Sequence, residues 1–188
     1  NHDLGGSVLV EALASGTASA QFVMESLHVS GCGFGVACAR NGGGIAAIGR
    51  GAILEVISST IEGCTSQGSG ALYASAGSTI SILTSSFENN TASLKGGAIY
   101  IDGSFDTHGE PDSKVSLLGG KNMFAGNSAG TFGQSIAKWN NSEEKLVFDV
   151  CPPGTWQDDG AMNAPTKRFF IDHDFTGCPS SCEISGRT

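Results

Sequence analysis

Apolar and polar residues alternate with a period of two along much of the chain. The apolar members come in pairs: Val8/Val10, Phe22/Met24, Leu54/Val56, Ile80/Ile82, Ile99/Ile101, Val115/Leu117 and Leu146/Phe148. A period of two places both members of a pair on one face of an extended strand. No segment of useful length has apolar residues at positions i, i+3, i+4 and i+7. The pattern therefore predicts short β-strands and no amphipathic helix.

Two short motifs recur along these predicted strands. One is an apolar residue followed three positions later by Cys or Asn: Val29 and Cys32, Ile61 and Cys64, Phe87 and Asn90, Phe124 and Asn127. The other is a run of small residues before an aliphatic one, at Val8, Ile45, Leu72, Ile99 and Ile136. The shortest repeats are about 26 residues long, and the longer ones contain a glycine-rich stretch at 33–44 or a polar insert at 102–114. A motif that returns at a regular interval indicates stacked structural units.

Short strands, this repeat length and 28 glycines that suit tight corners predict an all-β fold. We expect a right-handed parallel β-helix over residues 1–150, with about four to five coils, because each coil needs its neighbours to bury its inward face. Equivalent residues of adjacent coils should stack about 4.8 Å apart.

Two such stacks follow from the motifs. The corner ladder would contain Cys32, Cys64, Asn90 and Asn127, and its asparagines would hydrogen-bond the backbone of the turn and each other. The core ladder would lie inside and contain Val29, Ile61, Phe87 and Phe124. Residues of a repeat normally build the scaffold, so we expect these positions to be structural.

The motifs also resemble a known family. Gly96-Gly97-Ala98-Ile99, with Phe87-Glu88-Asn89-Asn90 and Phe124-Ala125-Gly126-Asn127, resembles the repeat of the polymorphic outer-membrane protein family, known from chlamydial surface adhesins and from extracellular proteins of algae and other protists. The resemblance covers roughly residues 5–150 and departs from the pattern at Cys32 and Cys64, which replace asparagine. It implies a β-helix with a cell-surface or extracellular role, and it carries over no catalytic residue.

The tail, 151–188, differs from the repeats. Its Cys151-Pro152-Pro153-Gly154-Thr155-Trp156, followed by Cys178 and Cys182, resembles the Cys-Pro-Pro-Gly modules of extracellular receptors. We expect a loop-rich segment held by one or two disulfides that closes the C-terminal end of the solenoid.

The six cysteines, an even number, fit an oxidising compartment. We would pair Cys151 with Cys178, whereas Cys32 and Cys64 form either a disulfide or buried free thiols. The chain has no Cys-x2-Cys spacing and its histidines are scattered, which argues against a zinc site. We therefore expect no metal and no cofactor.

The net charge, the apolar stretches and the glycosylation sequons limit the partners and the cellular location that the chain could have. A net charge of −8 and a pI of about 4.8 argue against nucleic acid as a partner. No apolar stretch approaches the roughly 20 residues of a membrane span, and no signal segment opens the chain. We expect a mature form, a fragment or the ordered part of a longer protein.

Asn89 and Asn140 begin glycosylation sequons, and Asn89 should point outward beside Asn90.

An enzyme is one possible function, because many β-helices cleave polysaccharides. The polar insert contains Asp102, Asp106, His108, Glu110 and Asp112, which would suit acid/base catalysis or calcium, but a solvated loop is the favoured interpretation. Asp158-Asp159 and Ile171-Asp172-His173-Asp174 are similar to fragments of pectin-degrading enzymes but lack the accompanying motifs, so we attribute them to chance.

Two other functions remain. An outward stack of Tyr73 and Tyr100 would offer an aromatic platform for glycans, although ordinary cross-strand packing is the favoured explanation.

Gly5-Gly6 lies near the first residue, so we expect an open N-terminal solenoid edge for protein partners or self-assembly. The sequence therefore predicts a non-catalytic extracellular structural or adhesive protein. The alternatives are a glycan- or receptor-binding module and, less favoured, a polysaccharide-cleaving enzyme.

Overall fold

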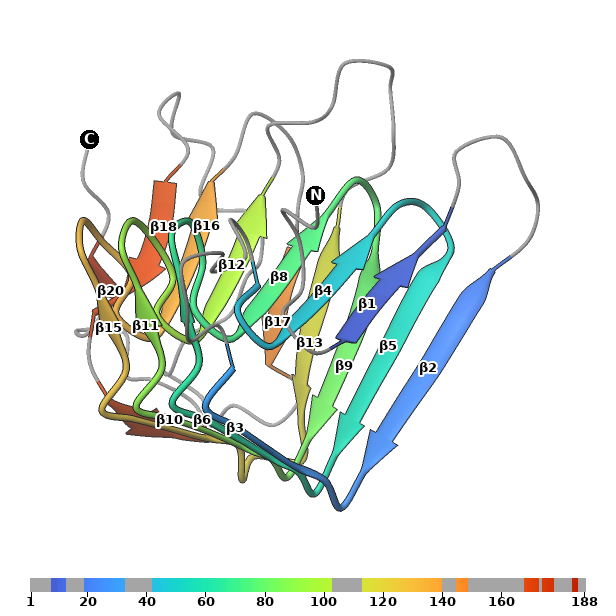
Figure 1. Ribbon diagram of the computed structural model, residues 1–188, viewed down its shortest axis with the longest axis horizontal. Coiled ribbons are helices and arrows are strands. Elements are labelled where there is room, and N and C mark those ends of the chain that lie inside the picture. Colours follow the sequence, from blue (N-terminus) through green and yellow to red (C-terminus); the bar gives the residue numbers. More distant parts are fainter. Residues whose placement is uncertain are drawn as a thin grey trace.

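The fold is known from a computed structural model that describes residues 8–12, 19–32, 42–102, 113–139, 145–148, 168–172, 174–177 and 184–185. The described residues form strands and turns and no helix. The chain winds through successive coils whose strands lie side by side (Figure 1).

Each coil contributes up to four short strands. The first coil has β1 (Val8–Glu11), β2 (Ala20–Glu25) and β3 (His28–Ser30). The second has β4 (Ile45–Ile48), β5 (Ala52–Ile57), β6 (Thr60–Glu62) and β7 (Thr65–Ser66). The third has β8 (Leu72–Ser75), β9 (Thr79–Leu83), β10 (Ser86–Glu88) and β11 (Thr91–Ala92). The fourth has β12 (Ile99–Asp102), β13 (Lys114–Leu118), β14 (Met123–Ala125) and β15 (Ser128–Ala129). The fifth has β16 (Ile136–Trp139) and β17 (Lys145–Phe148).

Corresponding strands of successive coils pair in parallel and form four sheets. Sheet 1 has the order β1-β4-β8-β12-β16-β18-β20, sheet 2 the order β2-β5-β9-β13-β17, sheet 3 the order β3-β6-β10-β14-β19, and sheet 4 the order β7-β11-β15. The chain runs from sheet 1 to sheet 4 in each complete coil and then begins the next one (Figure 1). This is a parallel β-helix, as the repeat predicted.

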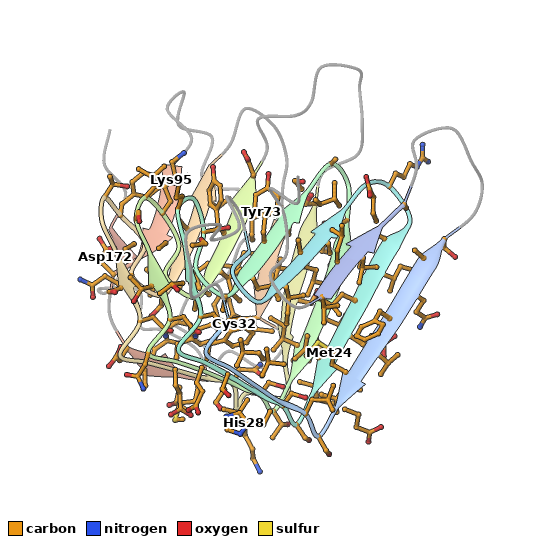
Figure 2. The ribbon with its side chains drawn as sticks, viewed as in Figure 1. Met24, His28, Cys32, Tyr73, Lys95 and Asp172 are labelled. Atoms are coloured by element: carbon orange, nitrogen blue, oxygen red, sulfur yellow. A yellow bond between two sulfur atoms is a disulfide. The ribbon has the colours of Figure 1, made fainter. Side chains whose placement is uncertain are left out.

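One apolar core fills the inside of the coils. In sheet 2 the inward residues Leu54, Ile80, Val115 and Leu146 lie in register and are fully buried. Their equivalent in the first coil, Phe22, pairs with Leu54 but is 39% exposed. Both β2 and β17 are end strands of this sheet, and Met24 on β2 is fully buried, so an end position alone does not expose an inward residue. Figure 2 shows Met24 of the same strand pointing inward and His28 pointing to solvent.

The corner between sheets 3 and 4 has the same backbone conformation in four coils. Its residues Gly31, Gly63, Asn89 and Gly126 have φ values of 61°, 62°, 54° and 62°. Glycine and asparagine tolerate this left-handed region better than other residues, which explains why these types precede each member of the corner ladder.

The C-terminal segment reverses direction and joins the last two coils. Strand β18 (Arg168–Ile171) pairs antiparallel with β16, β19 (Phe175–Thr176) pairs antiparallel with β14, and β20 (Ile184–Ser185) pairs with β18. Part of the tail thus continues sheets 1 and 3. The division into domains at residue 150 stays a prediction, because residues 149–167 lie outside the described part.

Candidate functional site

The corner ladder is a column of buried hydrogen bonds. The Oδ1 of Asn90 accepts from the backbone N–H of Cys64 at 3.0 Å, and its Nδ2 donates to the Ile61 carbonyl at 3.0 Å. One coil further, the Oδ1 of Asn127 accepts from the backbone N–H and from the Nδ2 of Asn90 at 3.1 and 3.0 Å. The Nδ2 of Asn127 donates to the Phe87 carbonyl at 2.8 Å. Each amide therefore satisfies backbone groups of the preceding coil that would otherwise be buried without a partner.

A disulfide replaces the amides at the N-terminal end of this ladder. Cys32 and Cys64 are bonded to each other, so the first two coils are covalently linked at the corner (Figure 2). Of the two alternatives left by the sequence, disulfide or free thiols, the structure has the disulfide. Cysteine at these positions keeps the coil-to-coil contact and changes its chemistry from hydrogen bonds to a covalent bond.

A second polar ladder, which the sequence pattern did not predict, lies at the corner between sheets 2 and 3. The Oγ of Ser59 accepts from the Leu27 N–H at 3.1 Å, and the Oγ of Ser85 accepts from the Ser59 N–H at 3.1 Å. The Oδ1 of Asn122 accepts from the Ser85 N–H at 3.0 Å. The available signal was a small polar residue two positions before Ile61, Phe87 and Phe124.

The core ladder is a continuous stack. Val29, Ile61, Phe87 and Phe124 pair in register along sheet 3. The rings of Phe87 and Phe124 lie 5.2 Å apart with an interplanar angle of 4°. Phe175 of β19 extends the stack, with its ring 4.5 Å from that of Phe124. Phe175 was missed because the tail does not repeat the motif.

The tail's carboxylates bind backbone N–H groups of the last two coils. The Oδ1 of Asp172 accepts from Gly133 at 2.6 Å and from Gln134 at 3.0 Å (Figure 2). The Oδ1 of Asp174 accepts from Gly126 at 2.9 Å. The segment that we attributed to chance therefore has a structural role, which is to close hydrogen bonds at the C-terminal end.

The outer face of sheet 1 holds a second, smaller cluster. Ala46, Tyr73, Tyr100 and Ala137 lie in register there and are buried, with Ile48 and Phe132 packed against them. Tyr73 is 1% exposed and Tyr100 4% exposed, so the alternative of an outward aromatic platform is wrong and the favoured explanation, cross-strand packing, holds. The two rings lie 5.9 Å apart and are tilted by 37°, which is packing on a covered surface.

Polar groups border this cluster. The Tyr73 hydroxyl donates to the Oδ2 of the buried Asp102 at 2.9 Å. The Nζ of Lys95 donates to the Tyr100 hydroxyl at 3.2 Å and lies 5.1 Å from the centre of that ring (Figure 2). Of the five polar residues singled out in the insert, Asp102 is thus bound to a neighbouring coil. The other four, Asp106, His108, Glu110 and Asp112, lie outside the described residues.

Of the remaining predicted residues, some lie in the part of the chain that the structure describes and others lie outside it. Asn89 is exposed beside the buried Asn90, as expected of a sequon residue at this corner. Asn140, Cys151 and Cys178 lie outside the described residues. Among the residues that the structure describes, no group of three or more His, Cys, Asp or Glu side chains could hold a metal ion. No helix in that part of the chain is long and apolar enough to cross a membrane.

Comparison with known proteins identifies one repeat. Residues 84–102 match the family model of the Chlamydia polymorphic membrane protein repeat. The match runs from the turn before β10 to the end of β12 and contains Phe87, Asn90 and the Gly96–Ile99 motif. It confirms the resemblance for this repeat and supports a cell-surface location in broad terms. The resemblance of the tail to Cys-Pro-Pro-Gly modules stays a prediction. Searches of curated proteins and of solved structures gave no match.

Proposed function

We propose that this chain is a non-catalytic structural or adhesive unit of a cell-surface or extracellular protein. The observation that carries the proposal is the pair of corner ladders. Their side chains, Asn90, Asn127, Ser59, Ser85 and Asn122, direct their hydrogen bonds to the backbone of the adjacent coil. Such residues hold coils in register and leave little hydrogen-bonding capacity for a substrate.

The described carboxylates of the candidate enzyme segments support the same conclusion. A general acid or base must come within hydrogen-bond reach of the proton that it transfers. Asp172 and Asp174 instead bind backbone N–H groups, and Asp102 binds the Tyr73 hydroxyl from a buried position. These three carboxylates therefore act as scaffold contacts.

The extracellular setting is supported by the Cys32–Cys64 disulfide and by the matched repeat.

The exposed Asn89 is the candidate glycosylation site among the described residues. Secretion of the chain from a eukaryotic host, followed by measurement of its intact mass, tests whether Asn89 carries a glycan. Thr91→Ala removes this sequon and Thr91→Ser preserves it, so loss of a glycan mass in the first variant alone would assign the site.

Two assays test the proposal together. A membrane-impermeant amine label applied to intact source cells should mark the protein, because a surface location exposes its lysines. The purified chain should release no reducing ends from pectin, alginate or other acidic polysaccharides. Release that is abolished by Asp102→Asn would make the chain an enzyme and overturn the proposal. Absence of surface labelling, with labelling after lysis, would overturn the location.

A further inference from the structure

The outer face of sheet 2 is a side of the solenoid on which aliphatic residues gather. The five strands of this sheet lie side by side from β2 to β17 (Figure 1). Alternate residues of these strands point outward, because the residues between them, such as Leu54 and Ile80, are buried in the core. We call this surface the lateral face, and its aliphatic members are Val23, Ile53, Ile57, Leu83, Leu118 and Val147.

Three of these residues form a continuous row. Ile57, Leu83 and Leu118 lie in register on β5, β9 and β13. Leu83 in the middle of the row is 36% exposed, and Val23 on β2 is 47% exposed. The outward residues of β6 and β10 on the neighbouring sheet 3 are all polar: Thr60, Glu62, Ser86 and Glu88. Exposed aliphatic residues in register over several strands are typical of a surface that binds another protein.

Charged residues divide the lateral face along the solenoid axis. Glu25 and Glu55 lie on β2 and β5, in the first two coils, and the Oε1 of Glu55 accepts from the Nε2 of Gln21 at 3.1 Å. Lys114 lies on β13 in the fourth coil, and the exposed Lys121 follows that strand. The outward residues of β9, between the two groups, carry no charge. A face with opposite charges at its two ends is complementary to a second copy of itself that runs in the opposite direction.

We propose that the lateral face binds a second copy of this chain in an antiparallel dimer. The two-fold axis would lie parallel to the strands and pass over β9, so that Leu83 meets Leu83 of the second copy. The in-register row then places Ile57 against Leu118 of the second copy. Lys114 of the second copy would cover Ile53 with its aliphatic stem and bring its ammonium group beside Glu55.

The charges favour this arrangement over the other two-fold arrangement. If the axis ran along the solenoid, each coil would face the same coil of the second copy, and Glu55 would meet Glu55. The two acidic ends would also come together, and like charges in contact oppose association. The antiparallel arrangement brings each acidic end to a basic end.

The size of the lateral face determines how strong the dimer is. Its five strands cover roughly 20 Å by 15 Å, since strands are about 4.8 Å apart and each residue adds about 3.3 Å. This area is smaller than the roughly 800 Å² per partner of a standard interface. We therefore expect a weak dimer, with a dissociation constant on the order of 100 μM.

A weak contact of this kind becomes effective where many copies are held at one surface. In an antiparallel dimer the same end of each copy points in the opposite direction, which suits contact between two surfaces that face each other. This biological role rests on the surface function proposed above, whereas the dimer itself does not.

Analytical ultracentrifugation of the purified full chain tests the association. The parent should change from monomer to dimer between roughly 10 μM and 1 mM. Leu83→Asp places two carboxylates against each other on the two-fold axis and should raise the dissociation constant at least about tenfold. The matched control is Leu94→Asp, because Leu94 is 49% exposed and lies outside sheet 2, and it should leave the constant unchanged. A parent that stays monomeric, or equal constants for the two variants, would overturn the proposal.

A charge exchange tests the orientation. Glu55→Lys and Lys114→Glu should each weaken the dimer, because each places like charges together. The double variant should recover most of the parent's affinity, since opposite charges meet again in exchanged positions. Single variants with the parent's affinity, or a double variant that recovers nothing, would overturn the antiparallel dimer.

Cross-linking provides an independent check of the same contact. Carbodiimide treatment of a mixture of heavy-isotope-labelled and unlabelled parent should join Glu55 of one copy to Lys114 of the other, in a peptide that carries both isotope compositions. Mixed peptides that join only residues outside the lateral face would overturn the proposal. These measurements use the purified chain, so a failure of surface labelling would overturn the location and leave the dimer unaffected.

Discussion

Asn90 illustrates how one side chain connects three coils. Its amide accepts from Cys64 and donates to Ile61 and Asn127, all within a buried corner. Asn90→Ala would leave buried donor and acceptor groups without partners, and each such group costs about 1–3 kcal/mol. We expect a loss of about 3 kcal/mol in the free energy of unfolding, measured by urea denaturation.

The matched control for Asn90 is Thr79→Ala, an exposed position on the outer face of sheet 2. Surface substitutions of this kind stay within about 0.5 kcal/mol. A loss of similar size for both variants would show that the corner amides do not hold the coils together.

Phe124 tests the core ladder at the same scale. Its ring is stacked between those of Phe87 and Phe175 and is buried. Phe124→Ala should cost about 3–5 kcal/mol, because the cavity cannot close between two fixed rings. Thermal unfolding by circular dichroism measures the change. The exposed Leu94 provides the comparison, and Leu94→Ala should be nearly neutral. A near-zero loss for Phe124→Ala would contradict the inward stack.

The corner between sheets 3 and 4 is an element that depends on backbone conformation. Gly31 and Gly126 have almost the same φ, 61° and 62°, but different surroundings. A Cβ at Gly31 would meet nothing within 4 Å, whereas a Cβ at Gly126 would overlap the Oδ1 of Asn89. Gly31→Ala should therefore cost only the left-handed conformation, about 1–2 kcal/mol, and Gly126→Ala should cost more. Equal losses in denaturant midpoints would show that Asn89 moves aside freely.

The disulfide corner tests whether cysteine and asparagine are alternatives at one structural position. Cys32→Ser with Cys64→Ser removes a link across 32 residues, and such a loss typically costs about 2–4 kcal/mol. Cys32→Ser with Cys64→Asn should recover part of it, because the introduced amide would accept from the N–H of residue 32 as Asn90 does from Cys64. Thermal midpoints under identical non-reducing conditions decide the question. Identical midpoints for the two double variants would mean that the amide ladder cannot extend into the first coil.

The whole molecule shows which features a sequence can predict. The β-helix and its two ladders were predictable because each coil repeats the same residues at the same register, as Phe87 and Phe124 do. Ser59 and Ser85 were not recognised, because serine is common in turns and carries little signal by itself. The burial of Tyr73 and Tyr100 depends on what lies over the outer face of sheet 1, which period-two alternation does not encode.

The closure of the C-terminal end was expected, but its means were not. A tail that returns antiparallel does not follow the repeat, so neither Phe175 nor the aspartates stood out as contacts of the last two coils. The motif Ile171-Asp172-His173-Asp174 binds the backbone N–H groups of Gly126, Gly133 and Gln134. Because these partners lie far away in the sequence, the motif alone did not indicate its structural role. Sequence repeats thus predict the interior of a solenoid better than its ends.

The end closure leads to a prediction about the whole molecule. Asp172→Ala removes the acceptor shared by Gly133 and Gln134, and these N–H groups would then have to open to water. Hydrogen exchange should accelerate in β16 and β18 and remain unchanged in β5 and β9, because stability in a solenoid is set mainly by nearest-neighbour coils. Asp172→Asn keeps an amide oxygen at the same place and should restore most of the protection. Acceleration that spreads equally through all coils would mean that the solenoid unfolds as one unit and that its ends are not independent.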